Sequence, residues 1–230
     1  MKIGFIIPTK EEAAGVPAGC VAACGFGAGK SSNCAAAADL IFNRGCDTIV
    51  IWGTAGGLSP ELQAGDVVVA NRVAHKDFSL TPLPWARGLG DVPEFSEEDF
   101  WHTLDGALVE KLRMAARTVF PEHKVVIGPV CSGDIFDPAA ARGNPIEAQA
   151  WAVDMETSAV AEFCHRLNTR CGMAIRFGTI RVISNNADTS NSNEAGDDFG
   201  AFLQRFAAMN ARLVRLQELL ESPNTVCVGL

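Results

Sequence analysis

Short apolar runs alternate along this chain with longer stretches whose apolar residues recur at helical spacing. Short β-branched apolar runs are typical of buried strands, and apolar residues three or four apart are typical of helices that pack on a sheet. The alternation predicts one α/β domain whose central sheet is largely parallel or mixed. We expect strands at residues 3–7, 19–24, 47–52, 66–73, 124–130, 149–153 and 173–183. We expect helices at residues 33–43, 104–119, 156–167 and 198–221.

Size and charge narrow the class of protein. The 230 residues suit a single domain spanning 1–230, with residues 222–230 as a loose C-terminal tail. The net charge of -8 argues against a protein that binds nucleic acid, because such a protein needs a basic surface. No apolar stretch is long enough to span a membrane, and the first apolar run is too short for a signal peptide. We therefore expect a cytoplasmic protein without a membrane partner.

The eight cysteines first suggest a disulfide framework. Most of them lie inside apolar runs, where a free thiol behaves as a small hydrophobic side chain. The sequence contains no Cys-x-x-Cys pair, and its four histidines are scattered. We therefore expect free thiols in a reducing compartment, no metal site and no other cofactor.

The segment Asp154-Met155-Glu156 marks the place where an apolar run ends and a helical pattern begins. Ligands of α/β proteins bind beyond the strand ends, and the other polar motifs of this chain also follow predicted strands. A carboxylate at such a junction is held firmly and can face a ligand. A sugar with two neighbouring hydroxyl groups is a suitable partner for it, because a carboxylate accepts two hydrogen bonds.

Residues 25–32, Gly-Phe-Gly-Ala-Gly-Lys-Ser-Ser, lie between a predicted strand and a predicted helix, as a phosphate-binding loop would. That motif requires glycine at position 24, where this chain has Cys24. Three interpretations stay open. The segment could serve a nucleotide triphosphatase with residues 153–156 as its acidic magnesium partner, it could be a tight turn with Lys30 in solvent, or it could be a wall beside the sugar of a ligand.

Two other polar segments have functional and structural interpretations. Glu11 and Glu12 are expected to begin a helix, where carboxylates interact favourably with the helix dipole even when they have no other role. Residues 78–100 are rich in proline, glycine and acidic side chains, which predicts a long surface loop. Such loops often contact a ligand or a partner.

Five segments occur in a fixed order along the chain. They are Met1-Lys-Ile-Gly with Glu11-Glu12, Gly53-Thr-Ala-Gly-Gly-Leu with Gly65-Asp-Val-Val-Val, Ser132-Gly-Asp-Ile-Phe136, Asp154-Met-Glu-Thr-Ser-Ala-Val-Ala, and Arg181-Val-Ile-Ser-Asn-Asn-Ala-Asp188. In this order, from about Cys24 to the last helix, they resemble the 5′-methylthioadenosine/S-adenosylhomocysteine nucleosidases of the wider purine and uridine phosphorylase superfamily. The resemblance implies a three-layer α/β phosphorylase/hydrolase-like fold with a central mixed sheet. It also implies a homodimer whose partner subunit closes the site.

The resemblance implies that the chain hydrolyses the N-glycosidic bond of a purine nucleoside. Glu12 would position the attacking water, and Glu156 would accept hydrogen bonds from the ribose hydroxyl groups. Arg181 would brace Glu156. Met155 would contact the sugar, and Asn185 would contact the purine edge as the second catalytic residue. The residues implied to contact the base are Phe136, Ser132 and Gly133. The residues implied to form the pocket wall are Thr54, Ala55 and Gly56.

The chain departs from the family pattern in two places. Where the family has an aspartate that donates a proton to N7 of the purine, this chain has Asn185, which can form hydrogen bonds but cannot act as a general acid. An asparagine there resembles superfamily members that accept 6-oxopurines, such as trimeric purine nucleoside phosphorylases and futalosine hydrolases. The family also has roughly thirty more residues after Glu12, so a helix and a hairpin are expected to be missing here.

The acceptor of the sugar is a separate question. The hexameric phosphorylases of the superfamily place a phosphate-binding arginine where this chain has Ile51, which favours water over phosphate. Lys10, Lys30 and Ser31 keep phosphate open. A purine nucleoside phosphorylase, a hydrolase of inosine, guanosine or futalosine, and a non-catalytic nucleoside-binding protein are the alternatives.

Overall fold

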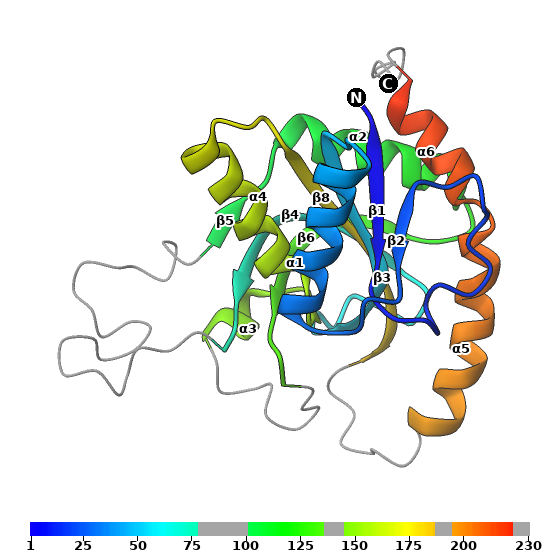
Figure 1. Cartoon of the computed structure of the whole chain (residues 1–230). Helices are drawn as coiled ribbons and strands as arrows, with labels where there is room; N and C mark the ends of the chain where they lie inside the picture. Colours follow the sequence, from blue (N-terminus) through cyan, green and yellow to red (C-terminus); the bar gives the residue numbers. More distant parts are fainter. Residues whose placement is uncertain (78–100, 136–144, 187–194, 223–230) are drawn as a thin grey trace, which may run out of the picture.

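The computed structural model describes residues 1–77, 101–135, 145–186 and 195–222 (Figure 1). Its strands are β1 (Ile3–Ile7), β2 (Ala22–Cys24), β3 (Thr48–Gly57), β4 (Val67–His75), β5 (Trp101–Thr103), β6 (Val125–Ser132), β7 (Ala152–Asp154) and β8 (Arg176–Asn186). Its helices are α1 (Lys30–Ala38), a π-helical continuation η1 (Asp39–Asn43), α2 (Gly106–Val119), α3 (Pro145–Gln149), α4 (Thr157–Cys171), α5 (Ala195–Asn210) and α6 (Leu213–Glu221).

The strands form one mixed sheet, as predicted. β3 lies at its centre and pairs in parallel with β1 and β8, while β1 pairs in parallel with β2. β8 pairs antiparallel with β4, β4 pairs in parallel with β6, and β6 pairs in parallel with β7. β7 returns to the end of β3, where it pairs antiparallel. The strands β3, β8, β4, β6 and β7 therefore close into a ring, and their ends meet around one region.

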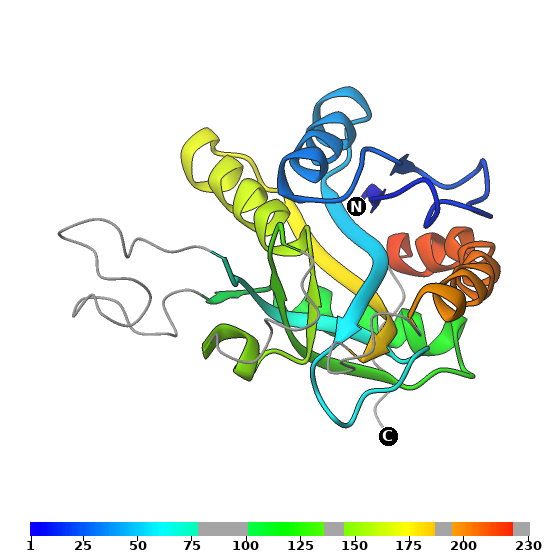
Figure 2. The same cartoon turned by 90° about the horizontal axis from the view of Figure 1, so that it is seen from below.

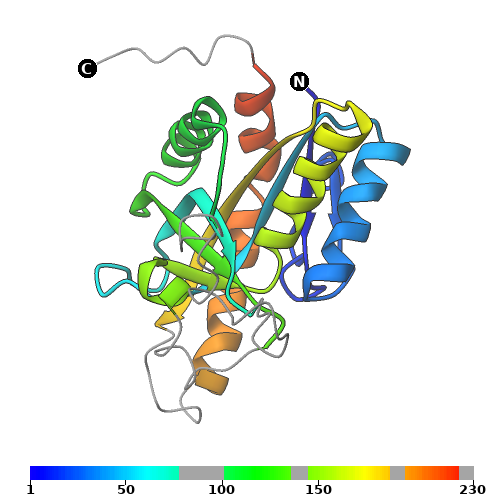
Figure 3. The ribbon, with the colours of Figure 1, turned by 90° about the vertical axis from the view of Figure 1, so that its left-hand side faces the viewer.

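Helices cover both faces of the sheet, which confirms the predicted three-layer architecture. α1 and α4 pack side by side on one face, and α2, α5 and α6 cover the other (Figures 2 and 3). Successive side chains of β3 point to opposite faces of the sheet, as expected for a strand. Ile49 and Ile51 pack in the cluster under α1 and α4, whereas Val50 and Trp52 pack in the cluster with α2, α5 and α6.

The structure corrects several predicted boundaries. The strand expected to stop at Trp52 continues through Gly57, because pairing with β8 and β7 keeps the glycine-rich segment extended. The helix predicted over residues 198–221 is two helices that separate after Asn210. The strand predicted over residues 149–153 begins only at Ala152, because Gln149 ends α3.

The segment after β1 also differs from the prediction, because it forms an irregular turn instead of a helix. Residues 9–15 form a turn with one helix-like backbone bond, from the Ala13 N–H to the Thr9 carbonyl (3.1 Å). The helix expected to begin at Glu11 and Glu12 is therefore absent, in agreement with the shortened sequence. The predicted loop at 78–100, Phe136 and the tail residues 223–230 lie outside the described residues.

The described part of the chain carries seven cysteines, and each of them is a free thiol. Cys131 is fully buried, and burial raises the pKa of thiols such as Cys20 and Cys164 to about 12. These thiols are therefore neutral packing groups, as the apolar sequence context indicates. None of the helices within the described ranges could cross a membrane.

Candidate active site

Glu156 lies at the junction between β7 and α4, where the sequence pattern changes from strand to helix. Its side chain is buried, with 5% of the residue exposed, and it accepts hydrogen bonds from two other parts of the chain. Arg181 Nη2 donates to Glu156 Oε2 (2.9 Å), and the Gly29 N–H donates to Oε1 (3.1 Å). The carboxylate therefore has a fixed position between β8 and the glycine-rich turn.

Asp154 explains why the chain turns from strand to helix at this point. One of its carboxylate oxygens accepts the N–H groups of Glu156 and Thr157 (both 3.1 Å), which are unpaired donors in the first turn of α4. The same oxygen accepts the Ser132 hydroxyl, and Ser132 in turn accepts the Ser158 N–H (2.9 Å). Asp154 is therefore a structural cap that also orients its neighbour Glu156.

Arg181 joins these two carboxylates from β8. It is fully buried, its Nε lies 2.8 Å from Asp154 Oδ2, and its Nη2 bonds to Glu156. Burial alone would lower the pKa of Arg181, but Asp154 and Glu156 raise it above its ordinary value. The guanidinium therefore stays charged in the interior, as a buried cation does when acidic groups surround it.

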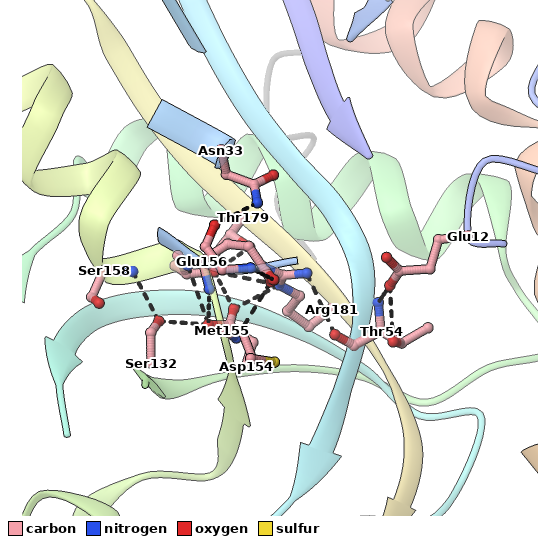
Figure 4. Close-up of polar contacts among 12 residues, drawn as sticks. Glu12, Asn33, Thr54, Ser132, Asp154, Met155, Glu156, Ser158, Thr179 and Arg181 are labelled. Carbon is pink, nitrogen blue, oxygen red and sulfur yellow. Dashed lines mark hydrogen bonds and ion pairs between the residues drawn. The ribbon is translucent and has the colours of Figure 1, made fainter. Parts of the chain in front are cut away.

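Glu12 reaches the same cluster from the turn after β1. Its Oε1 accepts the Thr54 N–H (2.7 Å) and the Thr54 hydroxyl (2.9 Å), and its Oε2 accepts the Thr9 hydroxyl (3.0 Å). Although the helix that would carry Glu12 is missing, the carboxylate has a defined place beside β3. Figure 4 shows Glu12 and Glu156 on opposite sides of Arg181.

Gly53 allows the two sides of the cluster to approach each other. A Cβ atom on this residue would lie 2.6 Å from Arg181 Nη1 and 3.0 Å from Glu12 Oε1, distances at which atoms overlap. Only glycine leaves room for this approach without a shift of a neighbour. Arg181 thus pairs with Asp154 and Glu156 on one side of Gly53, and Glu12 lies across Gly53 from it.

The surroundings of Glu156 change its ionisation. Burial raises the pKa of Glu156 to about 7, Arg181 lowers it, and the charges of Asp154 and Glu12 raise it further. A buried carboxyl group that also faces other negative charges is easier to protonate than one in water. Perturbed carboxylates of this kind are frequent at catalytic sites.

The glycine-rich turn lies against Glu156, so the structure favours the interpretation of residues 25–32 as a wall of the site. The N–H groups that a phosphate-binding loop would direct at phosphate already have acceptors: Gly29 donates to Glu156, and Lys30 donates to Asp134 Oδ1 (3.0 Å). The Lys30 ammonium pairs with Asp77. The turn is held by Asn33, whose amide donates to the carbonyl groups of Gly27 (2.9 Å) and Gly29 (2.8 Å).

The remaining predicted site residues differ in what their side chains can contact. Met155 is half-buried between buried neighbours, so it can reach a ligand beside Glu156. Ser132 is fully buried and its hydroxyl is used by Asp154, which makes it a support for the site and not a base contact through its side chain. The Gly133 N–H donates to the Asp154 carbonyl (3.1 Å).

The residues of β3 that were predicted to form the pocket wall lie partly in the hydrophobic core. Thr54 holds Glu12, whereas Ala55 is buried in the core under α1 and α4 and offers only its backbone. Gly56 pairs with Asn185 in the sheet, so the backbone of Asn185 lies at the end of β8 beyond Arg181. The Asn185 side chain and Phe136 lie outside the described residues.

Asp154, Gly53 and Asn33 support the site although sequence reasoning gave none of them that role. Asp154 has a local signal, since Asp side chains commonly accept backbone N–H groups a few residues ahead and so favour turns and helix starts. The need for glycine at position 53 and the contact between Asn33 and the turn have no such signal, because each depends on residues from elsewhere in the chain.

The fold agrees with comparisons to known proteins. A family model described as the phosphorylase superfamily matches residues 11–220. A 5′-methylthioadenosine/S-adenosylhomocysteine nucleosidase of Mycobacterium bovis is 32% identical over 219 residues, which cover 87% of this chain and 81% of the relative. The nucleosidase of Pseudoalteromonas translucida is 30% identical over 216 residues, 93% of this chain and 83% of the relative.

Solved structures give the same result. The Neisseria meningitidis nucleosidase in complex with methylthio-immucillin-A matches with a TM-score of 0.71 and 28% identity, covering 95% of this chain and 98% of that chain. A Helicobacter pylori futalosine hydrolase shares the fold, with a TM-score of 0.70, 22% identity, and coverage of 95% of this chain and 97% of that one. The chain therefore belongs to the phosphorylase superfamily and, within it, to the family of 5′-methylthioadenosine/S-adenosylhomocysteine nucleosidases.

Proposed function

We propose that this protein hydrolyses the N-glycosidic bond of a purine nucleoside. The observation that supports this most is that Glu12 lies across Gly53 from Arg181, while Arg181 bonds to Glu156. Glycosidic cleavage passes through a sugar cation, and paired carboxylates are the groups that such a reaction uses. The family to which the chain belongs consists of nucleosidases that act on purine nucleosides.

In this proposal the two carboxylates have different tasks. Glu156 accepts hydrogen bonds from the 2′- and 3′-hydroxyl groups of the ribose, and its negative charge stabilises the sugar cation more than the neutral substrate. Glu12 positions the attacking water and accepts its proton. Met155 packs on the sugar, and Phe136 stacks on the base beside Gly133.

The charges around the cluster favour water as the acceptor. Phosphate binding requires cations that are free to face the anion. Arg181 is engaged by Asp154 and Glu156, Lys30 is paired with Asp77, and Lys76, next to Gly133, is paired with Glu147 (2.7 Å). A phosphate ion would have to compete with these carboxylates and would lie close to their charge.

Asn185 supports a second candidate, the hydrolysis of 6-oxopurine nucleosides. An amide can donate to a carbonyl oxygen through its N–H and accept from a protonated N7 through its oxygen, but it cannot protonate N7 of adenine. We therefore expect release of hypoxanthine or guanine to be faster than release of adenine. The Asn185→Asp variant should reverse this order and increase adenine release at least about tenfold, since general acid catalysis is worth about 10²–10⁴-fold.

The test of both candidates is base release from a panel of nucleosides, with and without phosphate. The panel contains methylthioadenosine, S-adenosylhomocysteine, adenosine, inosine, guanosine and futalosine. Hydrolysis predicts the free base, a free sugar that keeps its 5′ substituent, and a rate unchanged by phosphate. Production of a sugar 1-phosphate that depends on phosphate would instead identify a phosphorylase and would point to Lys10 or Lys30. Thermal stabilisation by a nucleoside without product would identify a binding protein.

We also propose that two copies of the chain assemble, as the family resemblance implies, and that the protein works in the cytoplasm. Two large apolar side chains beside the site are exposed: Phe26 in the glycine-rich turn, with 43% exposure, and Ile135 after Asp134, with 65% exposure. A second copy that covers them would remove apolar surface from water. Light scattering should give the mass of a dimer, and Ile135→Asp should shift it toward the monomer.

A further inference from the structure

Asn210 connects the end of α5 to the turn that carries Glu12. Its side chain is fully buried, and its Nδ2 donates to two carbonyl groups of the turn, those of Glu12 (2.6 Å) and Ala14 (2.7 Å). Its Oδ1 accepts the indole N–H of Trp52 (2.6 Å). Because an indole N–H can only donate, this bond fixes the orientation of the amide and directs its NH₂ group at the turn.

Trp52 holds this connection rigidly. Its indole ring stacks between Phe120 and Phe206, with ring centroids 5.2 and 5.4 Å away. Trp52 lies directly before Gly53 on β3, so the strand that brings Glu12 and Arg181 together also carries the anchor for Asn210. A chain of contacts therefore runs from the aromatic core through Trp52 and Asn210 to the backbone of Glu12.

The turn has local bonds but no regular structure. The Glu12 N–H donates to Thr9 Oγ1 (3.1 Å), and Glu12 Oε2 accepts the Thr9 hydroxyl (3.0 Å). No helix continues from the turn, and within it the Ala14 N–H to Glu11 carbonyl bond is long (3.4 Å). The turn instead lies against α5, and Figure 1 shows the segment between β1 and β2 beside α5 and α6. Gly15 has a positive φ of 79°, and a Cβ atom there would lie 2.5 Å from the Ala207 carbonyl oxygen. The backbone of the turn therefore sits directly on α5.

We propose that Asn210 is a positioning residue for Glu12, which replaces the support that a helix after β1 would otherwise give. This inference rests on the proposed function, in which Glu12 positions the attacking water. Loss of the amide leaves two carbonyl groups without their donor, and the turn then moves relative to Thr54 and Arg181. Since a misplacement of about 1 Å can cost about 10²-fold in rate, kcat should fall while substrate binding, which depends on Glu156, changes little.

The experiment uses three single variants. Asn210→Ala removes the amide, and Gly15→Ala displaces the turn from α5 while the Asn210 side chain itself is kept. Asn168→Ala is the matched control, because Asn168 also holds a backbone segment by two bonds, with the carbonyl and the N–H of Ile175 (both 2.7 Å). It lies twelve residues after Glu156 in α4, about 18 Å along the helix axis.

Two measurements distinguish the positioning of Glu12 by Asn210 from a general loss of folding. Hydrogen–deuterium exchange of residues 9–16 should become faster in Asn210→Ala and Gly15→Ala, and it should stay unchanged in Asn168→Ala. With the nucleoside that the wild-type protein turns over fastest, kcat should fall about ten- to a hundredfold in the first two variants, with KM within about threefold. In the Glu12→Gln background, Asn210→Ala should cause no further decrease in kcat.

The possible outcomes distinguish the positioning role of Asn210 from the proposed function. Unchanged exchange in the turn would overturn the positioning role, whatever happens to the rate. Faster exchange with an equal loss of kcat in both backgrounds would show that Asn210 acts on the whole fold and not through Glu12. If the wild-type protein cleaves no nucleoside, the proposed function fails, and exchange alone decides whether Asn210 holds the turn. If Asn210→Ala does not fold, Asn210→Ser, which keeps a smaller polar side chain but cannot bond to both carbonyl groups of the turn, is measured in its place by the same two readouts.

Discussion

The two carboxylates of the site are held in different ways. Glu156 sits where a strand becomes a helix, and its neighbour Asp154 caps that helix, so its backbone is fixed by regular structure. Glu12 sits on a turn without regular structure, and its backbone is tied to Asn210, which is 198 residues away in the sequence. One half of the site therefore has its backbone set mainly by neighbouring residues. The other half combines a local bond from the Glu12 N–H to Thr9 Oγ1 (3.1 Å) with the distant bonds of Asn210.

Glu156→Gln should have the largest effect on activity. The substitution keeps the size of the side chain but removes the negative charge that faces the sugar cation. We expect kcat/KM to fall by at least about 10³-fold, at the upper end of what a single stabilising group contributes. Because Glu156 also binds the ribose, both kcat and KM should change, whereas Glu12→Gln should change mainly kcat. Steady-state kinetics of the two variants measure this difference.

The matched control for this prediction is Glu110→Gln. Glu110 also pairs with an arginine, Arg113, but on the surface of α2. The variant should retain the activity of the wild-type protein, since exposed ion pairs contribute little. Near-normal activity of Glu156→Gln would show that the ribose assignment is wrong. A loss confined to kcat in both glutamate variants would contradict the division of tasks between them.

Gly53→Ala tests whether the two halves work as one site. The added methyl group would overlap Arg181 Nη1 and Glu12 Oε1, so it should push the two halves apart. We expect a loss of about 10²-fold in kcat/KM and a destabilisation of about 1–3 kcal/mol, typical of an overpacked interior. Kinetics and chemical denaturation measure the two effects.

Gly106→Ala is the control for the added methyl group. A Cβ atom on Gly106 would have no neighbour within 4 Å, and the residue begins α2. Alanine should therefore leave activity unchanged and stabilise the helix slightly. If Gly53→Ala retains full activity, Glu12 and Arg181 do not need their close approach, and the two carboxylates act independently.

The sequence predicted the strand-to-helix junction that carries Glu156. The change of periodicity at Asp154-Met155-Glu156 gave the junction between β7 and α4, because both patterns are properties of neighbouring residues. The order of the five segments gave the three-layer fold and the family. The short stretch after Glu12 also predicted that a helix would be missing there.

The contacts of Asn210 with the Glu12 turn could not be predicted from the sequence, because they join residues far apart in the chain. The segment 53–57 looks like a turn until pairing with β8 and β7 holds it extended. The apolar periodicity of residues 198–221 continues across the break at Asn210, where the side chain bonds to Glu12 and Ala14 instead of solvent. No pattern in the sequence around Asn33 predicted that its side chain would bond to the glycine-rich turn.

The smallest expected effect is a pair of opposite pH trends that centre on Glu156. Its raised pKa of about 7 means that the free protein is increasingly protonated there below neutral pH. If the ionised form binds ribose, kcat/KM should fall about tenfold per pH unit below about 7. Stability should change in the other direction. The protonated side chain avoids a buried charge, so its contribution is fully present below pH 4.5 and is lost as the pH rises through about 7.

Comparison with Glu156→Gln isolates this stability effect from those of other groups. The wild-type protein should lose a few degrees of Tm relative to the variant between pH 5 and about pH 8, because glutamine does not titrate. A constant difference in Tm over this range would mean that Arg181 keeps Glu156 ionised throughout. In that case the acid side of the activity profile would have to come from another group.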